Sequence, residues 1–303
     1  MGQIGSTKKL LTFVFLLVLV GGYFLGYHTV HTKALDEKHH AAVVHQQQKV
    51  NVQNELEAAW KKVLQATPPD GDVNIAVYDH ATGATATYSN AASTYTFNTA
   101  SIVKLSILET TLWQDQQQGL SGLTSAQLTQ AEPMIENSDN DAATDLWNMI
   151  GGTSAVNAFF QKIGATNSTA GTQGLWGLTQ TTAPDQLKVV NEVAYPSKGT
   201  LLTPASAAQA NSLMDQVESD QRWGVTGGVP SGVSVELKNG WLDDAGNTST
   251  DGWNINSIGH VHGDGVDYTI AVLTDNDNTM QDGVNTIQSL STATWNTLNA
   301  AKS

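Results

Sequence analysis

The sequence contains no cysteine and little positive charge. Without cysteine the chain has no disulfide, no thiolate nucleophile, no cysteine zinc site and no cysteine for lipoprotein acylation, so packing alone must hold the fold. Lysine and arginine number 14 against 28 aspartate and glutamate residues, which gives a net charge of -14. Because nucleic-acid binding requires clustered cations that neutralise phosphates, we predict no nucleic-acid partner.

One long hydrophobic run lies near the N-terminus. Residues 10–27 (LLTFVFLLVLVGGYFLGY) carry no charge and follow two lysines. This length is near the lower limit for a membrane-spanning helix, and the preceding positive charges predict that residues 1–9 form a cytoplasmic tail. We therefore predict a single-pass membrane anchor with the rest of the chain outside. The alternative is a cleaved signal peptide and a secreted protein, although the run is longer than the usual hydrophobic core of such peptides.

The remainder divides into a polar segment and a globular domain. Residues 28–53 hold five of the eight histidines among lysine, glutamine and acidic residues, a composition typical of a solvated stalk. The domain is predicted over 54–303 and begins with an apolar stripe at Leu56, Trp60 and Leu64 that indicates a helix. The other predicted elements are a hairpin of strands 73–78 and 84–88, helices within 101–214, strands 233–241, 254–261 and 268–274, and a closing helix 282–298. Since helices and strands come in blocks, we predict the α+β fold class.

The first candidate site is Ser101-Ile102-Val103-Lys104, at the predicted start of a helix. Residues three apart share a helix face, so the Lys104 amine can reach the Ser101 hydroxyl. A serine hydroxyl is a weak nucleophile until a neighbour accepts its proton, and burial can lower the pKa of a lysine enough for it to do so. The helix N-terminus would favour an oxyanion at Ser101. The pattern by itself is common, and Ser6 to Lys9 also fits it.

Two further motifs follow. Ser138-Asp139-Asn140 precedes a helical run, where Ser138 could relay a proton to a leaving nitrogen, Asn140 could bind a substrate amide, and Asp139 could brace the turn; a simple helix N-cap is the alternative. Lys238-Asn239-Gly240-Trp241 ends a predicted strand. There Lys238 could bind a substrate carboxylate or support the proton relay at Ser138. Gly240 would allow the substrate backbone to approach closely, and the Trp241 amide could complete an oxyanion hole with that of Ser101; an ordinary Asn-Gly turn is the alternative.

Together, the motifs occur in the order S-x-x-K, S-D-N and K-x-G, as in class A β-lactamases and penicillin-binding proteins. From about residue 55 to 303 the sequence resembles the class A β-lactamase-like serine hydrolases. The resemblance implies an antiparallel sheet flanked by terminal helices, with a helical subdomain inserted over about 101–204. It also implies a cleft lined by Ser101, Lys104, Ser138, Asn140, Lys238 and Gly240. Asn239 stands where the family usually has a hydroxyl residue, so its amide would replace that hydroxyl as the hydrogen-bond donor to the substrate carboxylate.

The resemblance implies an extracytoplasmic hydrolase that forms an acyl-enzyme on Ser101 and hydrolyses β-lactam amide bonds, without a cofactor and as a monomer. In class A β-lactamases a glutamate in the loop before a Thr-Thr-x-Pro segment, which is 181–184 in this sequence, activates the water that releases the acyl group. Residues 146–184 contain no aspartate or glutamate. This departure favours slow hydrolysis, or the alternative of a D,D-peptidase-like enzyme acting on peptidoglycan peptides. A catalytically silent cell-wall-binding protein with the same fold is a further alternative.

No metal site is predicted from the sequence. His260 and His262 have the spacing of residues on one face of a strand, but no third ligand is evident near them. Arg222, the only arginine, could anchor a substrate carboxylate or form a surface or helix-end contact. We expect the tryptophans to be core residues, with Trp176 and Trp241 as the two exceptions.

Overall fold

The computed structural model describes residues 38–197, 199–243 and 252–302. The chain divides into two compact units, Met1–Lys49 and Val50–Ser303. In the first unit, residues 38–49 are helical. The predicted tail and membrane anchor lie outside the described residues, and within those residues no helix has both the length and the hydropathy needed to span a bilayer.

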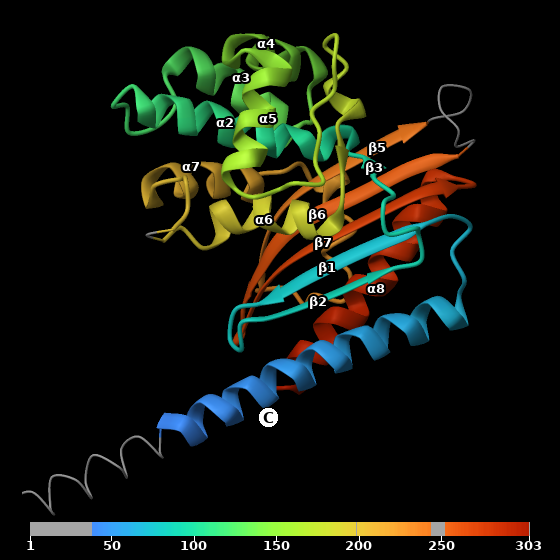
Figure 1. Ribbon diagram of the computed structural model, residues 1–303. Helices are drawn as coiled ribbons and strands as arrows, with labels where there is room; N and C mark the ends of the chain where they lie inside the picture. The colour runs from blue at the N-terminus through green and yellow to red at the C-terminus, as the bar shows by residue number, and fades with distance from the viewer. Residues whose placement is uncertain (1–37, 198, 244–251, 303) are drawn as a thin grey trace, which may run out of the picture. The chain divides into compact units, whose positions relative to one another are not determined.

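A five-stranded antiparallel sheet is the centre of the second unit, with the strand order β2-β1-β7-β6-β5 (Figure 1). Its strands are β1 (Val73–Asp79), β2 (Ala84–Ser89), β5 (Ser234–Asp243), β6 (Trp253–Gly263) and β7 (Val266–Asp277). The hairpin predicted from the first two alternating runs is present as β1 and β2. Each of the three later strand patterns corresponds to one of β5 to β7. β6 and β7 extend beyond both predicted ends, and β5 extends beyond its predicted C-terminal end, because neighbouring strands continue their pairing.

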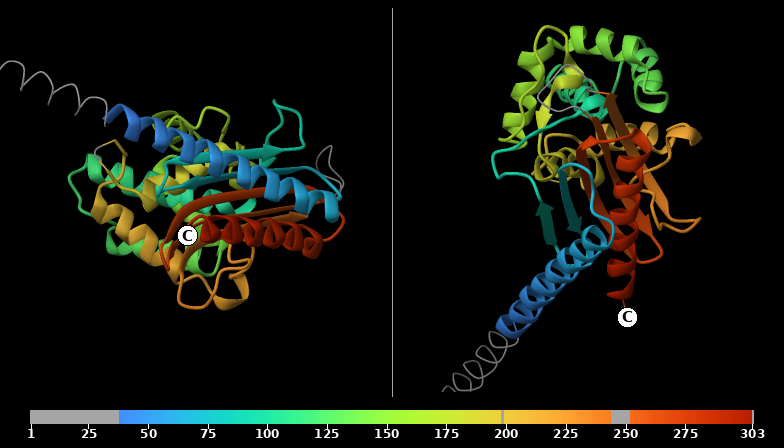
Figure 2. Two further views of the ribbon diagram at one scale, coloured as in Figure 1. Left: turned by 90° about the horizontal axis from the view of Figure 1, so that it is seen from below. Right: turned by 90° about the vertical axis from the view of Figure 1, so that its right-hand side faces the viewer.

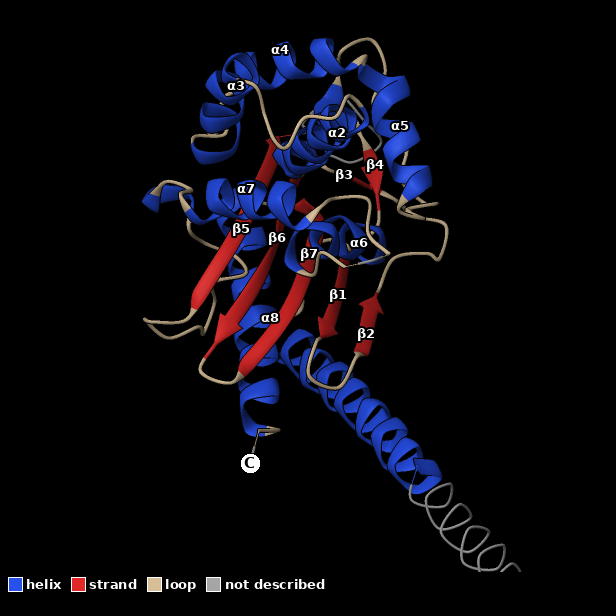
Figure 3. Cartoon of the chain, turned by 90° about the vertical axis from the view of Figure 1, so that its left-hand side faces the viewer, coloured by secondary structure: helices blue, strands red, loops and turns tan. Residues whose placement is uncertain are grey.

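Helices cover both faces of this sheet. The central strand β7 is buried along almost its whole length, as expected for a strand covered on both sides. Figure 3 shows α6 (Ala183–Ala194) and α7 (Pro204–Asp215) on one face and α8 (Met280–Ala300) behind the other, and both views in Figure 2 show α8 running along the sheet. The helical residues 50–66 pack with α8, where Trp60 Nε1 donates a hydrogen bond of 2.9 Å to Thr294 Oγ1.

Four further helices gather at one end of the sheet (Figures 1 and 3). They are α2 (Val103–Gln117), α3 (Ser125–Glu136), α4 (Asn140–Ile150) and α5 (Gly152–Lys162). Short elements join this group to the sheet: the pair β3 (Phe97–Asn98) and β4 (Gln180–Thr181), and the 3-10 turns η1 (Ala100–Ile102) and η2 (Trp176–Leu178). A third 3-10 turn, η3 (Ser219–Gln221), lies between α7 and β5. In the described part of 101–214, the predicted helical pattern corresponds to six α-helices, α2 to α7, with short 3-10 turns and β4 among them.

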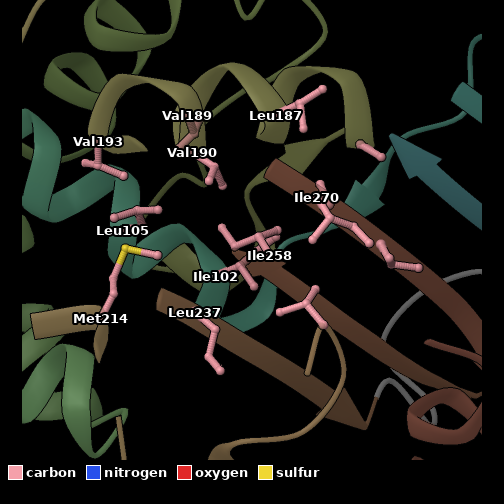
Figure 4. Close-up of a cluster of buried hydrophobic side chains, with 14 of the residues drawn as sticks. Ile102, Leu105, Leu187, Val189, Val190, Val193, Met214, Leu237, Ile258 and Ile270 are labelled. Atoms are coloured by element: carbon pink, nitrogen blue, oxygen red, sulfur yellow. The ribbon is translucent and has the colours of Figure 1, made fainter. Parts of the chain in front are cut away.

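Apolar side chains fill the space between the helices and the sheet (Figure 4). Leu105 of α2, Val190 of α6 and Ile258 of β6 are all fully buried there. A buried leucine or isoleucine is worth roughly 1.5–3 kcal/mol relative to an exposed one, so this cluster fixes α2 against the sheet. The predicted α+β fold, an antiparallel sheet flanked by N- and C-terminal helices, is confirmed.

Candidate active site

Ser101 lies in η1, on the short path from β3 to α2, and its side chain is partly exposed. The preceding residue, Ala100, has a φ of 45°, an uncommon conformation for a residue with a side chain. The segment is fixed from β6, where Asn256 Nδ2 donates hydrogen bonds to the carbonyls of Asn98 (2.9 Å) and Thr99 (3.0 Å). Asn256 is fully buried. The sheet therefore holds the serine in a strained turn.

Gly240 of β5 allows the backbone of η1 to approach the sheet closely. A Cβ atom at Gly240 would lie 2.7 Å from the Ser101 nitrogen, 2.8 Å from the Ile102 nitrogen and 2.8 Å from the Thr99 oxygen. Such distances are shorter than van der Waals contact, so a side chain would displace η1. Gly240 thus permits a close approach of the chain's own backbone, while its predicted role in the approach of a substrate backbone stays a prediction.

Lys104 lies one helical turn after Ser101, and its side chain is fully buried. Its Nζ donates to the Ser138 carbonyl (2.6 Å), Ser138 Oγ (3.1 Å) and Asn140 Oδ1 (2.8 Å). The Trp176 ring lies 4.9 Å from the same nitrogen. Burial lowers the pKa of Lys104 from 10.5 to about 7, against an opposing effect of the Asp139 charge. A substantial fraction of Lys104 is therefore a neutral amine near pH 7, able to accept a proton.

Ser138 and Asn140 are presented by the start of α4. Asp139 is the N-cap of this helix, and its Oδ1 accepts a hydrogen bond of 2.8 Å from the Ala142 nitrogen. Ser138 has a φ of 59°. The sequence offered a helix N-cap and a catalytic motif as alternatives, but the two coexist: the Asp139 cap braces the turn and directs the neighbouring side chains toward Lys104.

Lys238 and Asn239 are fully buried on β5. Lys238 Nζ donates 3.0 Å to the Asn239 carbonyl, and burial together with the nearby Lys104 charge lowers the pKa of Lys238 well below its usual range. The two hydrogens of the Asn239 amide are directed to the carbonyls of Gln221 (2.7 Å) and Trp223 (3.1 Å). A substrate carboxylate would have to displace these contacts to receive the hydrogen bond predicted from Asn239.

A pocket of about 360 Å³ opens beside Ser101. Its lining residues are Ala100, Ser101, Asn140, Gly174, Leu175, Trp176, Gly177, Leu178, Trp241 and Leu242. The loop 174–178 forms one wall and contributes no carboxylate. Trp176 and Trp241, the two tryptophans expected outside the core, both line the pocket.

The structure thus brings Ser101, Asn140 and Trp241 to one pocket, with the Lys104 amine bonded to Asn140 behind it. Within the described residues, no hydrogen bond joins Ser101 Oγ to Lys104 Nζ. Arg222 donates to the carbonyls of Asp215 (3.0 Å) and Val235 (2.7 Å), so it ties the end of α7 to β5. The sequence reasoning missed Asn256, which lies among other polar residues of β6 and forms no motif.

A family model described as the β-lactamase enzyme family matches residues 127–298, more than half of the chain. The matched segment contains Ser138, Asn140 and Lys238, whereas Ser101 and Lys104 precede it.

Several solved structures have a similar fold. A class A β-lactamase from Bacteroides cellulosilyticus DSM 14838 superposes with a TM-score of 0.66 at 20% identity, covering 82% of this chain and 99% of that chain. For the protein PBP-A the TM-score is 0.65 at 18% identity, over 80% of this chain and 96% of that chain. The TLA-1 extended-spectrum β-lactamase gives 0.67 at 18%, over 81% and 99%. At these identities the likeness shows the fold alone.

Among curated proteins, the candidate lipoprotein LppW of Mycobacterium tuberculosis is 26% identical over 173 residues, which are 56% of this chain and 54% of LppW. LppW of Mycobacterium bovis matches equally. The chain therefore spans about half the length of the curated relatives it matches. With the family match extending from α3 into α8, the chain belongs to the β-lactamase enzyme family.

Proposed function

We propose that the chain is an active-site serine hydrolase that forms an acyl-enzyme on Ser101 with β-lactams or with the peptidoglycan peptides they resemble. The observation that carries this proposal is the burial of Lys104 against Ser138 and Asn140, which lowers its pKa. Its buried Nζ contacts Ser138 Oγ and Asn140 Oδ1, and its pKa of about 7 makes it a usable base one helical turn from a serine that opens on a pocket.

In the proposed reaction, the Lys104 amine takes the proton of Ser101 Oγ as that oxygen attacks the carbonyl carbon of the substrate amide. A contact between the two groups is required in the substrate complex, where catalytic hydrogen bonds often tighten. The backbone amides of Ser101 and Trp241 stabilise the resulting oxyanion. When the carbon–nitrogen bond breaks, Ser138 Oγ protonates the leaving nitrogen and is reprotonated by Lys104. The buried Lys238 of β5 supports this proton relay.

Release of the acyl group is proposed to be slow. Hydrolysis of an acyl-enzyme needs a base that activates water, and the loop 174–178 beside Ser101 brings leucine, tryptophan and glycine instead of a carboxylate. This wall favours a penicillin-binding, D,D-peptidase-like enzyme over an efficient β-lactamase. Lys104, whose pKa is lowered to about 7, is a group beside the pocket that could serve as the base for water.

We place this activity outside the cytoplasmic membrane. The apolar run over 10–27 and its preceding lysines support export with an N-terminal anchor, or secretion after cleavage. The lipoprotein description of LppW agrees with a location in the cell envelope.

The test is to incubate the protein with a penicillin and follow its intact mass with time, beside Ser101→Ala. We expect a mass increase equal to one penicillin on the wild type, persisting for minutes or longer, and none on Ser101→Ala. Rapid turnover without an accumulated adduct would contradict slow release of the acyl group and would indicate an efficient β-lactamase. Absence of both adduct and turnover would refute the penicillin-reactive serine and favour a silent cell-wall-binding protein.

A further inference from the structure

A second cluster of polar side chains lies on β5 and β6, toward the end of β5 opposite the pocket. Glu236 of β5 pairs directly with His260 of β6, and His262 follows two residues later on the same face. Near the other end of β5, Gly240 and Trp241 adjoin Ser101 and its pocket. The cluster takes no part in the chemistry proposed for Ser101.

The three side chains converge on one small volume. Glu236 Oε1 lies 3.0 Å from His262 Nε2, and Glu236 Oε2 lies 3.4 Å from His260 Nδ1. One nitrogen or oxygen from each residue falls within 4.8 Å of the others. Glu236 is only 8% exposed, and its Oε2 has no hydrogen-bond partner within the part of the chain that the structure describes.

Asp267, itself held by Tyr195, fixes the orientation of the His260 ring. Its Nε2 lies 2.8 Å from Asp267 Oδ1, and the Tyr195 hydroxyl donates to the same oxygen at 2.7 Å. In the neutral tautomer whose Nε2–H donates to Asp267, the ring presents the lone pair of Nδ1 toward Glu236 Oε2. Two acceptors that face each other in a buried site repel unless a cation stands between them.

We propose that Glu236, His260 and His262 bind a divalent transition-metal ion of the zinc type. Two histidine nitrogens and a carboxylate oxygen form a common zinc ligand set, with bonds of about 2.0–2.2 Å to the metal. Ligand atoms in such a tetrahedron are about 3.3 Å apart. Each carboxylate oxygen of Glu236 faces one histidine at a similar separation, Oε1 at 3.0 Å from His262 Nε2 and Oε2 at 3.4 Å from His260 Nδ1. The Asp267 carboxylate behind His260 is the outer-shell partner that histidine ligands to metals usually have.

Access and an open coordination position are also present. The His262 side chain is 42% exposed, so an ion reaches the cluster from solvent without opening the sheet. A water molecule can complete the coordination on that side. The competing occupant is a proton shared within the same network, which would give the cluster no response to metal.

The experiment measures Zn²⁺ binding to the full chain by equilibrium dialysis and metal analysis. Histidines are common metal ligands, and five more lie within residues 28–53. The wild type is therefore compared with His262→Gln and with His45→Gln, which removes an exposed histidine from a helix. We expect the wild type and His45→Gln to share a site that His262→Gln weakens about 100-fold or more. Asp267→Asn should weaken it about 10–100-fold, because it only orients His260.

A second measurement is the thermal unfolding midpoint with and without Zn²⁺, since an ion that binds only the folded state raises it. The midpoint of the wild type should rise with Zn²⁺, and that of His262→Gln should rise much less. Glu236→Gln, which keeps the shape of the side chain, provides an independent variant, and circular dichroism checks that each variant folds. Equal zinc affinity and equal midpoints in the wild type and these variants would overturn the proposal and leave a proton as the occupant.

Discussion

The pH dependence of acylation is the most direct measure of the Lys104 environment. Burial lowers the pKa of this lysine from 10.5 to about 7, a difference of about 5 kcal/mol in the balance between ammonium and amine. The neutral amine is then about one tenth of the population at pH 6 and about nine tenths at pH 8. If the amine is the base, acylation should rise about tenfold between these pH values and level off above pH 8.

A lysine with an ordinary pKa would behave differently. Its amine fraction, and with it the rate, would still rise about tenfold per pH unit through pH 9. The plateau therefore distinguishes a buried lysine from an exposed one. The pH at which the rate levels off tests whether Lys104 is buried against Trp176 and Ser138.

The assay is the second-order rate of labelling by a fluorescent penicillin, which reports the ionisation of the free enzyme. Ser101→Ala defines the background, and Lys104→Arg keeps the positive charge but holds its proton throughout the range. We expect Lys104→Arg to lose about 100-fold or more in rate at pH 8. A wild-type rate that climbs steadily to pH 9, or one that does not change between pH 6 and 8, would refute the reasoning.

Two further predictions concern packing and buried charge. Gly240→Ala places a methyl group 2.7 Å from the Ser101 nitrogen. It should lower the free energy of unfolding, measured in urea, by about 1–3 kcal/mol and should slow penicillin labelling. In the control Gly199→Ala the methyl group meets nothing within 4 Å, so neither quantity should change, and equal effects of the two substitutions would contradict the close approach at Gly240. Burial and the Glu192 charge raise the pKa of Glu109 well above 4.5. The folded chain then keeps a proton that the unfolded chain loses, so stability should fall as pH rises above about 4.5, by up to about 1.4 kcal/mol per unit; Glu109→Gln should remove this slope, and urea titrations with the same slope in both proteins would show that Glu109 is not its source.

The fold was predictable from the sequence because its elements are locally specified. Alternating apolar residues identified the β1–β2 hairpin and the three later strands, and these patterns record which faces are buried. The order of helices and strands then left few arrangements for one core. The separate limits of the helices between 101 and 214 were not predictable, since they depend on which turns pack against the sheet.

Other parts of the site were beyond sequence reasoning. Asn239 looked like a substrate donor, but the loop at η3 places the carbonyls of Gln221 and Trp223 against its amide. Asn256 gave no motif, although it holds the carbonyl groups before Ser101. Both contacts join segments that are distant in the sequence, so no local pattern records them.

The sequence by itself determined the spacing of Ser101 and Lys104 on one helical turn, and it showed the lack of acidic residues over 146–184. Tertiary structure alone decided that the Lys104 amine meets Ser138, 34 residues away, and that burial lowers its pKa. It likewise placed Glu236 beside His260 through the register of β5 and β6. Helical spacing is a local property of the backbone, whereas burial, pKa and ligand sets arise only when distant segments pack together.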